Sequence, residues 1–578
     1  MIDSAVDPPC DPTTILPRPR LLRPADGVLE LRRLTPLLCA HGAEPAAEWL
    51  AQRLRDGLGW GAGADLLPLR GPGPEGLALR LLLDPAVSGG PEDYRLTINA
   101  SGVEVRGAGP RGVLHGVRSL LALLPPRALA VDGASWSGAP QGRDPVLARL
   151  PHLVIEDGPR LAYRGLMLDV ARSFLPVADV CAIVEAAALA KINVLHLHLV
   201  DDQGWRLEIT NEGRHPEDTI DYTALTRISG GTAVDGGGYG GRPGRTGWYT
   251  QADYRRIVAF CRSRGVEVVP EIDVPGHVGA ALHAVPELCT PGSSHAASPL
   301  EPVAPADGST AVGRSYLDPA SAATRRFLHH VLGQVAALDP AGERIHLGGD
   351  EPWAMAERYG IGPGSPYAEL LTHAQQIVSG LGREPMGWNE AVSAGGGAGI
   401  LQLWHAGPQE RAALVRAAQE GARLVMSPAT RTYLDQKYDP SSPIGLTWAG
   451  AIDVPAARDW DPDVELDNLP PTALLGVEAP LWSETVRSRA DAEWLIFPRL
   501  LATAEVGWSP APRGARPQEP GKTRVSGKTG ETTAFLRRCA AWGPRMAVMG
   551  TAFHRAASVP WAAFGPVDGE GLPGDEET

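Results

Sequence analysis

The sequence predicts an α/β protein whose main domain is a (β/α)8 TIM barrel, with a small α+β accessory domain before it. Two observations support this fold class. From Tyr163 onward, eight short apolar runs alternate with amphipathic segments of helix length over roughly 340 residues, which is the pattern of repeated βα units. Polar and aromatic side chains follow directly after these runs, at the strand ends where a barrel carries its functional groups.

The chain of 578 residues has room for this barrel and for further domains. The predicted segments are, in chain order, a disordered N-terminus at 1–13, the α+β accessory domain at 14–155, the barrel at 156–510, a linker at 511–531, and a C-terminal helix with a disordered tail at 532–578. The linker is predicted from its Pro, Gly, Arg and Lys content, and the disordered tail from its acidic composition.

The accessory domain is predicted from local patterns. Tyr94–Ala100 and Val103–Arg106 alternate apolar and polar residues, which predicts a hairpin. A helix is expected over Gly109–Leu124, and the two prolines that follow directly are expected to end it. A last helix, Thr533–Arg555, is expected to pack back on the barrel.

The barrel depends on eight predicted strands and the helices between them. The strands are Gly165–Val170, Val194–Val200, Val266–Ile272, Arg344–Gly348, Pro385–Trp388, Ile400–Trp404, Arg423–Met426 and Leu474–Glu478. The helices include Val177–Ala190, Gln251–Ser263, Ala322–Ala337, Ala368–Leu381 and Gln409–Glu420. A doubly wound open sheet is the alternative, and the lack of a G-x-G-x-x-G motif after an early strand disfavours it.

Composition excludes several classes of partner. Lys and Arg number 53 against 67 Asp and Glu, a net charge of −14, so we expect neither nucleic acid nor an anionic membrane as a partner. The apolar run Val180–Val200 contains Glu185 and Lys191, which disfavours a lipid span. The N-terminus shows no secretory signal, which predicts a cytoplasmic protein. Six scattered cysteines predict no disulfide framework, and nothing in the sequence predicts a metal or a cofactor.

The residues that follow the predicted strands combine carboxylates with aromatic rings. They are, in strand order, Arg172, Asp201, Asp202, Asp273, His277, Asp350, Glu351, Trp388, Asn389, Glu390, Trp404, His405, Tyr433, Asp435, Trp482 and Glu484. Carboxylates transfer protons, and flat indole faces pack on the C–H faces of sugar rings. This combination is typical of glycoside hydrolysis, with a carbohydrate as the expected partner.

Five motifs carry a resemblance to a known family. They are Arg164–Arg172 (RGLMLDVAR), His196–Trp205 (HLHLVDDQGW), Glu271–His277 (EIDVPGH), His346–Glu351 (HLGGDE) and Phe497–Trp508 (FPRLLATAEVGW). In this order and at this spacing they resemble the family 20 glycoside hydrolases, the β-N-acetylhexosaminidases, from about residue 90 to about residue 555. The resemblance implies exo-acting, retaining hydrolysis of terminal β-linked GlcNAc, with GalNAc as a second candidate sugar.

The resemblance also implies roles for single residues. Glu351 matches the general acid/base, and Asp350 matches the residue that orients the substrate acetamido group. Arg172 matches the arginine that binds the 3- and 4-hydroxyls. The acetamido pocket would be formed by Trp388, Trp404, Trp482 and Tyr433, the outer hydroxyls would be bound by Asp435, Trp448 and Glu484, and the acid would be supported by Asp201, His277 and Asp273. Ser173 departs from the histidine often found in the family, and no function is assigned to it.

The residues themselves indicate the same mechanism. Asp350 and Glu351 are neighbours, so their side chains diverge and cannot flank a glycosidic bond as a retaining pair does. The nucleophile must then come from elsewhere, and the acetamido oxygen of the substrate fits that role. Asp350 would stay ionised beside the developing positive charge, and Glu351 would start the reaction protonated.

Other interpretations of these motifs are open at this point. His196 and His198 are expected to pack and hydrogen-bond inside the barrel and not to bind a metal. The Gly348-Gly349 pair is expected to form a tight turn. Asp201 and Asp202 lack the further ligands that a cation site needs. Trp205, Trp353 and Trp508 are expected to be core residues.

Two insertions, 212–249 and 289–314, are predicted to narrow the mouth of the barrel, which favours an exo-acting pocket. A sugar-binding protein without activity and a chitinase-like endo-enzyme are the rival functions. The presence of both Asp350 and Glu351 disfavours the first, and their adjacency disfavours the second.

Overall fold

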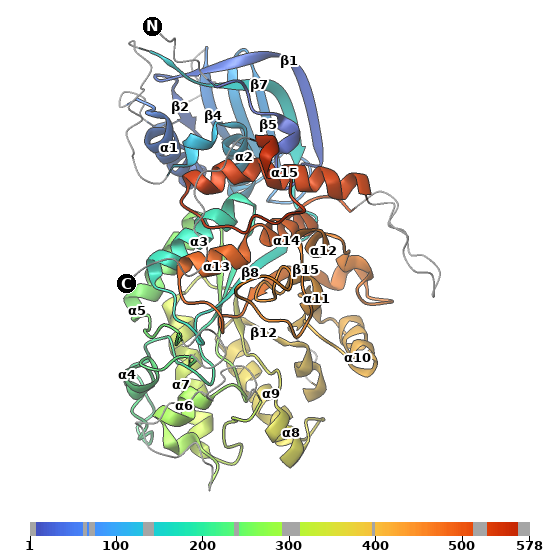
Figure 1. The fold of residues 1–578 in the computed structure, drawn as a ribbon. Coiled ribbons are helices and arrows are strands. Elements are labelled where there is room, and N and C mark those ends of the chain that lie inside the picture. The colour runs from blue at the N-terminus through green and yellow to red at the C-terminus, as the bar shows by residue number, and fades with distance from the viewer. Residues whose placement is uncertain are drawn as a thin grey trace.

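The computed structural model describes residues 7–61, 66–68, 76–130, 144–235, 242–291, 313–395, 399–511 and 529–564. It shows a closed barrel of eight parallel strands and a separate seven-stranded sheet, which lie one above the other in Figure 1. This arrangement confirms the predicted fold class.

The barrel strands follow one another around the barrel in chain order, and the last strand pairs with the first. They are β8 (Tyr163–Asp169), β9 (Val194–His198), β10 (Glu267–Glu271), β11 (Arg344–His346), β12 (Glu384–Trp388), β13 (Ile400–Leu403), β14 (Arg423–Met426) and β15 (Leu474–Leu481). All neighbouring pairs are parallel, for example Gly165 opposite Val194 and Glu271 opposite His346. All eight predicted strands are therefore present, with ends that differ by a few residues.

Helices surround this barrel. Those between the strands include α3 (Val177–Leu189), α5 (Gln251–Ser263), α7 (Ala322–Leu338), α9 (Pro366–Gly380) and α10 (Pro408–Gln419), which confirm the five predicted helices. Helix α5 begins where predicted because the Thr250 side chain caps it and Asp253 returns the hydrogen bond. Shorter helices lie mainly in the loops: α4 (Ala224–Ser229), α6 (Gly279–Ala284), α8 (Trp353–Tyr359), α11 (Ala429–Thr432), α12 (Val454–Arg458) and α13 (Arg489–Ile496), with α14 (Arg499–Trp508) closing the barrel.

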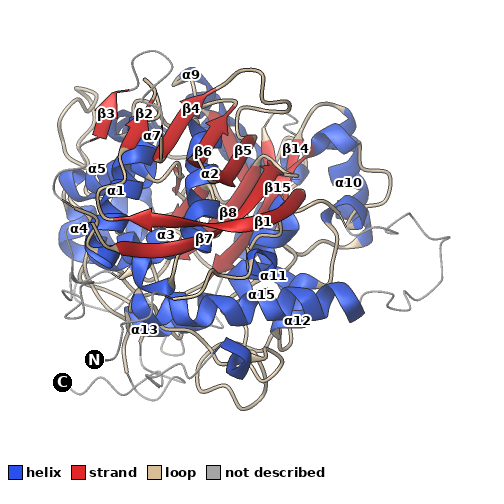
Figure 2. Cartoon of the chain, turned by 90° about the horizontal axis from the view of Figure 1, so that it is seen from above, coloured by secondary structure: helices blue, strands red, loops and turns tan. Residues whose placement is uncertain are grey.

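The accessory domain is a mixed sheet with two helices. Its strands are β1 (Leu21–Arg32), β2 (Leu37–Cys39), β3 (Leu66–Pro68), β4 (Ala78–Leu83), β5 (Tyr94–Asn99), β6 (Gly102–Gly107) and β7 (Val146–Asp157), in the order β1-β7-β5-β6-β4-β2-β3. The predicted hairpin is β5–β6, and the predicted helix is α2 (Pro110–Leu123), which packs beside α1 (Glu44–Leu58). Figure 2 views this sheet from above, with β1 and β7 crossing in front of the barrel strands.

The accessory domain sits at the end of the barrel where the strands begin. Arg164, near the start of β8, donates to Glu92 at 2.6 Å, and Asn193, just before β9, also contacts Glu92. Lys191 and Trp508 both donate to the buried Asp157 at the end of β7. The opposite end of the barrel, where the strands finish, is left for the site.

The two chain ends differ from the predictions. Residues 7–13 belong to the segment predicted to be disordered, yet Asp11 caps a short 3₁₀ helix at Pro12–Thr14. The C-terminal helix α15 spans Thr529–Val548 and stops before the predicted Arg555, because Gly550 adopts a φ of +65° and turns the chain. Helix α15 packs against α14 through a hydrogen bond from Arg538 to Glu505.

Several predicted features lie wholly or partly outside the described residues, among them most of the linker, the acidic tail and most of the 289–314 insertion. None of the described helices combines the length and apolarity that crossing a membrane requires.

Candidate active site

A cavity of about 350 Å³ opens at the end of the barrel where the strands finish. This volume lies within the range of pockets that hold small molecules. It is lined by Arg172, His277, Asp350, Glu351, Trp404, Tyr433, Asp435, Leu446, Thr447, Trp448, Trp482 and Glu484. These residues follow β8, β10, β11, β13, β14 and β15, so the loops after six of the strands build one site.

The side chains of Asp350 and Glu351 were expected to diverge, but the structure brings both to one histidine, with Glu351 at an unusual positive φ of +43°. Nε2 of His277 lies 3.7 Å from Oδ2 of Asp350 and 3.6 Å from Oε2 of Glu351. On its other side, Nδ1 of His277 lies 3.3 Å from Oδ1 of Asp201. Asp201 in turn forms an ion pair with Arg172 at 2.7 Å and pairs with His198 at 2.8 Å. The predicted supporting residues therefore form a continuous polar chain behind the two candidate catalytic carboxylates.

The backbone around these carboxylates adopts conformations that side chains rarely take. Gly348 and Gly349 have φ values of +65° and +92°, and a Cβ on Gly348 would collide with Asp273. His277 and Glu351 have positive φ values of +51° and +43° without being glycine, which is uncommon. The glycine pair thus forms the predicted tight turn, and Asp273, whose Oδ1 accepts from Gly349 N at 3.2 Å, lies beneath it.

The charges of this cluster are set by burial and by neighbours. Burial raises the pKa of Asp350 to about 6, with Glu351 adding to the rise and His277 opposing it. Burial would lower the pKa of His277, but Asp201 and Asp350 raise it well above its ordinary value. Near neutral pH, Asp350 is therefore mostly ionised beside a positively charged imidazole.

Arg172 and two acidic residues, Asp435 and Glu484, line another part of the cavity. Its guanidinium lies over the Trp482 ring, 4.8 Å from the ring centre. Burial raises the pKa of Asp435 to about 8, helped by Glu484, and raises the pKa of Glu484 to about 7 despite the opposing charge of Arg172. These two carboxyl groups therefore carry protons to higher pH than exposed ones do.

Several polar atoms in the cavity walls have no hydrogen-bond partner within the described part of the chain. They are Nε and Nη1 of Arg172, Oδ1 of Asp350, Oδ1 of Asp435 and Oε2 of Glu484. Buried donors and acceptors are normally paired, so such a set in a cavity indicates a polar ligand. Donors and acceptors side by side suit the hydroxyl and amide groups of a sugar.

Aromatic rings complete the cavity. Trp404 stacks on Tyr433 with ring centres 6.2 Å apart, and Trp448 meets both of them edge-on. Trp388, predicted as a wall residue, lies deeper: it is 1% exposed and does not line the cavity, but its ring lies 5.9 Å from that of Trp482. Its indole N–H points down to Glu271, which explains its depth.

The sequence analysis assigned no role to two residues of this region, Asp169 and Glu390. Asp169, the last residue of β8, accepts from the backbone of Arg172 at 3.1 Å and from the Ser483 hydroxyl at 2.9 Å, so it fixes two loops of the site. Glu390 accepts from the Trp404 indole at 3.1 Å, and burial together with Asp350 raises its pKa well above the ordinary value. Both lie in segments already singled out after strands, and only their partners reveal their roles.

Ser173, to which no function was assigned, holds the first insertion in place. Its hydroxyl accepts from the backbone of Arg245 at 3.1 Å, and its own N–H donates to Ser483. Val234 of the same insertion donates to the carbonyl of Arg172 at 2.9 Å. The described part of the 212–249 insertion therefore packs against the loop that carries Arg172.

Some His and acidic groups approach one another closely enough to hold a metal. They are His196, Glu271 and His346; His198, Glu271 and Asp273; Asp201, Asp202 and His277; and Asp273, His277 and Asp350. In the first group, both oxygens of Glu271 are already engaged by side-chain N–H groups. In the third group, Asp201 is paired with Arg172, and Asp202 accepts from Ser315. The absence of a metal stays a prediction.

Of the residues expected to be core, Trp205 and Trp508 are buried, whereas Trp353 is 55% exposed at the start of α8, so that expectation was wrong. Trp353 lies two residues after Glu351, where the chain leaves the site and runs along the surface.

This chain matches two models of known protein families. The model "Glycosyl hydrolase family 20, catalytic domain" matches residues 161–511, and the model "Glycosyl hydrolase family 20, domain 2" matches residues 12–158. The chain belongs to glycosyl hydrolase family 20. As a member of this family it is a glycoside hydrolase of the β-N-acetylhexosaminidase type, with its catalytic barrel and accessory domain in the family's order.

Individual family 20 proteins match almost the whole chain. A β-N-acetylhexosaminidase of Cellulomonas fimi is 35% identical over 560 residues, covering 96% of this chain and 98% of the relative. The structure of the family 20 β-N-acetylhexosaminidase from Streptomyces coelicolor A3(2) matches with a TM-score of 0.79 at 34% identity, covering 96% of this chain and 100% of that one. A mutant Streptomyces plicatus β-hexosaminidase in complex with its product GlcNAc matches with the same score and identity, covering 97% of this chain and 100% of that one.

Proposed function

We propose that this family 20 hydrolase removes terminal, non-reducing, β-linked N-acetylglucosamine with retention, and that the acetamido group of the substrate is the nucleophile. Glu351 protonates the leaving oxygen while the acetamido oxygen attacks the anomeric carbon, the glycosidic bond breaks, and an oxazolinium ion forms. Glu351 then takes a proton from a water molecule, which opens the ring at the anomeric carbon. Asp350 orients the acetamido group and stabilises its positive charge.

One observation carries this mechanism: Asp350 and Glu351 approach the same nitrogen of His277. Two carboxylates on one side of a site cannot act as acid and nucleophile from opposite faces of a sugar ring. The remaining carboxyl groups of the cavity, Asp435 and Glu484, have pKa values of about 8 and 7, so they are partly or largely protonated near neutral pH and are weak nucleophiles. Asp350 is ionised but is not placed to attack the anomeric carbon, so it suits the stabilisation of an oxazolinium ion.

The other walls suit recognition of the sugar. In this proposal Arg172 binds the 3- and 4-hydroxyls, and Asp435, Glu484 and Trp448 bind the outer hydroxyls. Tyr433 donates to the acetamido oxygen, while Trp404 and Trp482 form the walls of the acetamido pocket with Trp388 beneath them. The unpartnered polar atoms of Arg172, Asp435 and Glu484 support these assignments.

Exo action on chitin fragments follows from the same features. The cavity is walled by Arg172 on one side, and the described part of the 212–249 insertion packs against the loop that carries this residue. A relative named N,N'-diacetylchitobiase from Vibrio harveyi is 27% identical over 516 residues, covering 72% of this chain and 54% of the relative. We therefore propose short chitooligosaccharides as substrates, cleaved one sugar at a time from the non-reducing end.

The nucleophile is tested with substrates whose N-acetyl methyl group carries zero, one, two or three fluorine atoms. Fluorine withdraws electrons from the acetamido oxygen and changes its size only slightly, so kcat/KM should fall steeply along the series. A flat series would show that the enzyme supplies the nucleophile and would overturn the proposal. Release of monomer from a defined chitooligosaccharide over time separately tests exo action.

A further inference from the structure

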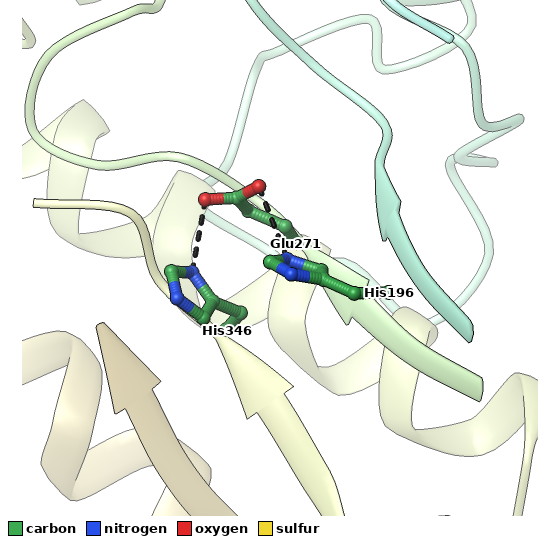
Figure 3. Close-up of side chains that lie close together, drawn as sticks. All are labelled: His196, Glu271 and His346. Carbon is green, nitrogen blue, oxygen red and sulfur yellow. Dashed lines mark ion pairs between the residues drawn. The ribbon is translucent and has the colours of Figure 1, made fainter. Parts of the chain in front are cut away.

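A buried carboxylate lies beneath the cavity at the end of β10. Glu271 is 0% exposed, and its two oxygens accept hydrogen bonds from different directions. Oε1 accepts from the Trp388 indole at 2.9 Å and pairs with His346 at 2.9 Å, whereas Oε2 pairs with His198 at 2.5 Å and lies 3.2 Å from Nε2 of His196. Figure 3 shows His346 and His196 on the two oxygens of this side chain.

Two branches lead from Glu271 to the cavity. The first is Trp388, whose ring lies 5.9 Å from the cavity-lining Trp482. The second is His198, which pairs with Asp201 at 2.8 Å, and Asp201 continues the chain to His277 and Glu351 as described above. One side chain therefore joins the floor of the sugar pocket to the proton network of the candidate acid.

We propose that Glu271 is a positioning residue, which holds the Trp388 floor of the pocket with one oxygen and the imidazole chain behind Glu351 with the other. It touches neither the cavity nor the reacting atoms. This inference rests on the proposed role of Glu351 as the acid, and it adds a residue that acts on acetamido binding and on proton transfer together.

An ionised carboxylate can accept from the Trp388 indole on one oxygen and from His198 on the other. Burial alone would raise the pKa of Glu271, but His198, His346 and His196 together hold it well below its ordinary range. Burial would likewise lower the pKa of His198, yet Glu271 and Asp201 raise it to about 9. A positively charged His198 donates from both ring nitrogens, one to Glu271 and one to Asp201, which fixes the ring between them.

The chain contains a matched control for this residue. Glu478 on β15 is also 0% exposed, and it accepts from His196 at 2.9 Å, from Tyr163 at 2.5 Å and from Gln402 at 2.7 Å. Among the described contacts, none of these joins Glu478 directly to Trp388 or to Asp201. Glu478→Gln therefore removes a buried negative charge of the same kind at a similar depth, without cutting either branch.

The experiment compares Glu271→Gln with Glu478→Gln in the full chain. An amide at position 271 replaces one acceptor oxygen with a donor, so it cannot accept both from Trp388 and from a charged His198. For Glu271→Gln we expect binding of a thiazoline mimic of the cyclised intermediate to weaken about 10- to 100-fold, because a displaced pocket floor no longer fits the cyclised ring. We also expect kcat/KM to depend more steeply on the leaving group, because a displaced acid harms poor leaving groups most.

For Glu478→Gln both readouts should stay within about threefold of the wild type. Equal changes in the two variants would show that only the loss of a buried charge matters, and would overturn the proposal. A merely structural role also would not alter the leaving-group dependence.

Single-branch variants keep the test decisive if Glu271→Gln does not fold. Trp388→Phe retains an aromatic floor but removes the N–H, so it should weaken the thiazoline mimic without changing the leaving-group dependence. His198→Gln should change the leaving-group dependence more than the affinity for the mimic, since its ring also packs edge-on against Trp482 at 5.0 Å. If each variant moves both readouts equally, or neither, the two-branch assignment is wrong.

Glu351→Gln separates the two proposals. Full activity in that variant would reject the proposed acid itself. If Glu351→Gln is inactive but the Glu271 and Glu478 variants behave alike, only the positioning role is rejected.

Discussion

In one part of the cavity lining, the charged side, Asp350 and Glu351 lie against a positively charged imidazole. In another part, the hydrogen-bonding side, the main charged neighbour of Asp435 is a second carboxyl group, Glu484. Arg172 pairs with Asp201 at 2.7 Å, and its charge lowers the pKa of Glu484 by less than burial raises it. The pKa of Asp350 is about 6, and those of Asp435 and Glu484 are about 8 and 7. Carboxyl groups in one pocket therefore take different protonation states according to their burial and their neighbours, one side for charge and the other for hydrogen bonding.

The largest expected effect tests the charged side. Glu351→Gln removes the proton donor and keeps the shape, so kcat should fall about 10²- to 10⁴-fold for a poor leaving group and far less for an activated aryl glycoside. Steady-state kinetics with both kinds of substrate would measure this, with the exposed Glu357→Gln in α8 as a control that stays active. Equal losses for both leaving groups would argue against the acid role.

The pH profile tests the charge of Asp350. This group has to be ionised to stabilise the oxazolinium ion, so kcat/KM should fall by about tenfold per pH unit as the pH drops below about 6. Asp350→Asn should have a much lower activity, and its kcat/KM should no longer fall as the pH drops below about 6. An unchanged limb in the variant would assign the titration to another residue.

The hydrogen-bonding side should respond differently to substitution. Asp435→Asn leaves a sugar hydroxyl with a poorer partner, at a cost of about 1–3 kcal/mol, so kcat/KM should fall about 5- to 150-fold. The loss should be the same for good and poor leaving groups, because Asp435 takes no part in proton transfer to the leaving group. A loss that grows with leaving-group pKa would erase the distinction between the two sides.

The stability of the fold should also depend on pH through the raised pKa of Asp435. The folded pKa of Asp435, about 8, is above its unfolded value of about 3.9. Between these two values the folded state binds more protons than the unfolded state, so this residue lowers stability progressively as the pH rises from about 4 to about 8. Asp435→Asn should therefore raise Tm relative to the wild type at pH 8 and leave it nearly unchanged at pH 4. Thermal unfolding at the two pH values measures the difference, and equal shifts at both would contradict it.

The smallest expected effect concerns metals. Neither side of the cavity requires an ion in the proposed mechanism, so exhaustive chelation should leave kcat/KM unchanged. Loss of activity that one divalent ion restores would show that one of the His and acidic clusters holds a metal, and would redraw the charge balance of the whole site.

Much of the fold could be predicted because its signals are local. Helix α5 begins and ends where expected, since Thr250 and Asp253 mark its start and its apolar face repeats with helical spacing. The buried parallel strands appear as short apolar runs for the same reason. The end of α15 and the cap at Asp11 were missed because single residues, Gly550 and Asp11, decide them against the surrounding composition.

The candidate site was predictable in its membership and not in its arrangement. The sequence pattern was enough to predict that carboxylates and aromatic rings follow the strands and meet, because a parallel barrel brings those positions to one end. The folded structure was needed to show that Trp388 lies beneath the pocket and that Asp350 and Glu351 approach one nitrogen of His277. It was also needed to show that Glu271 contacts both Trp388 and His198. Each of these depends on contacts between strands far apart in the chain, and protonation states depend on burial and neighbouring charge, which no local pattern encodes.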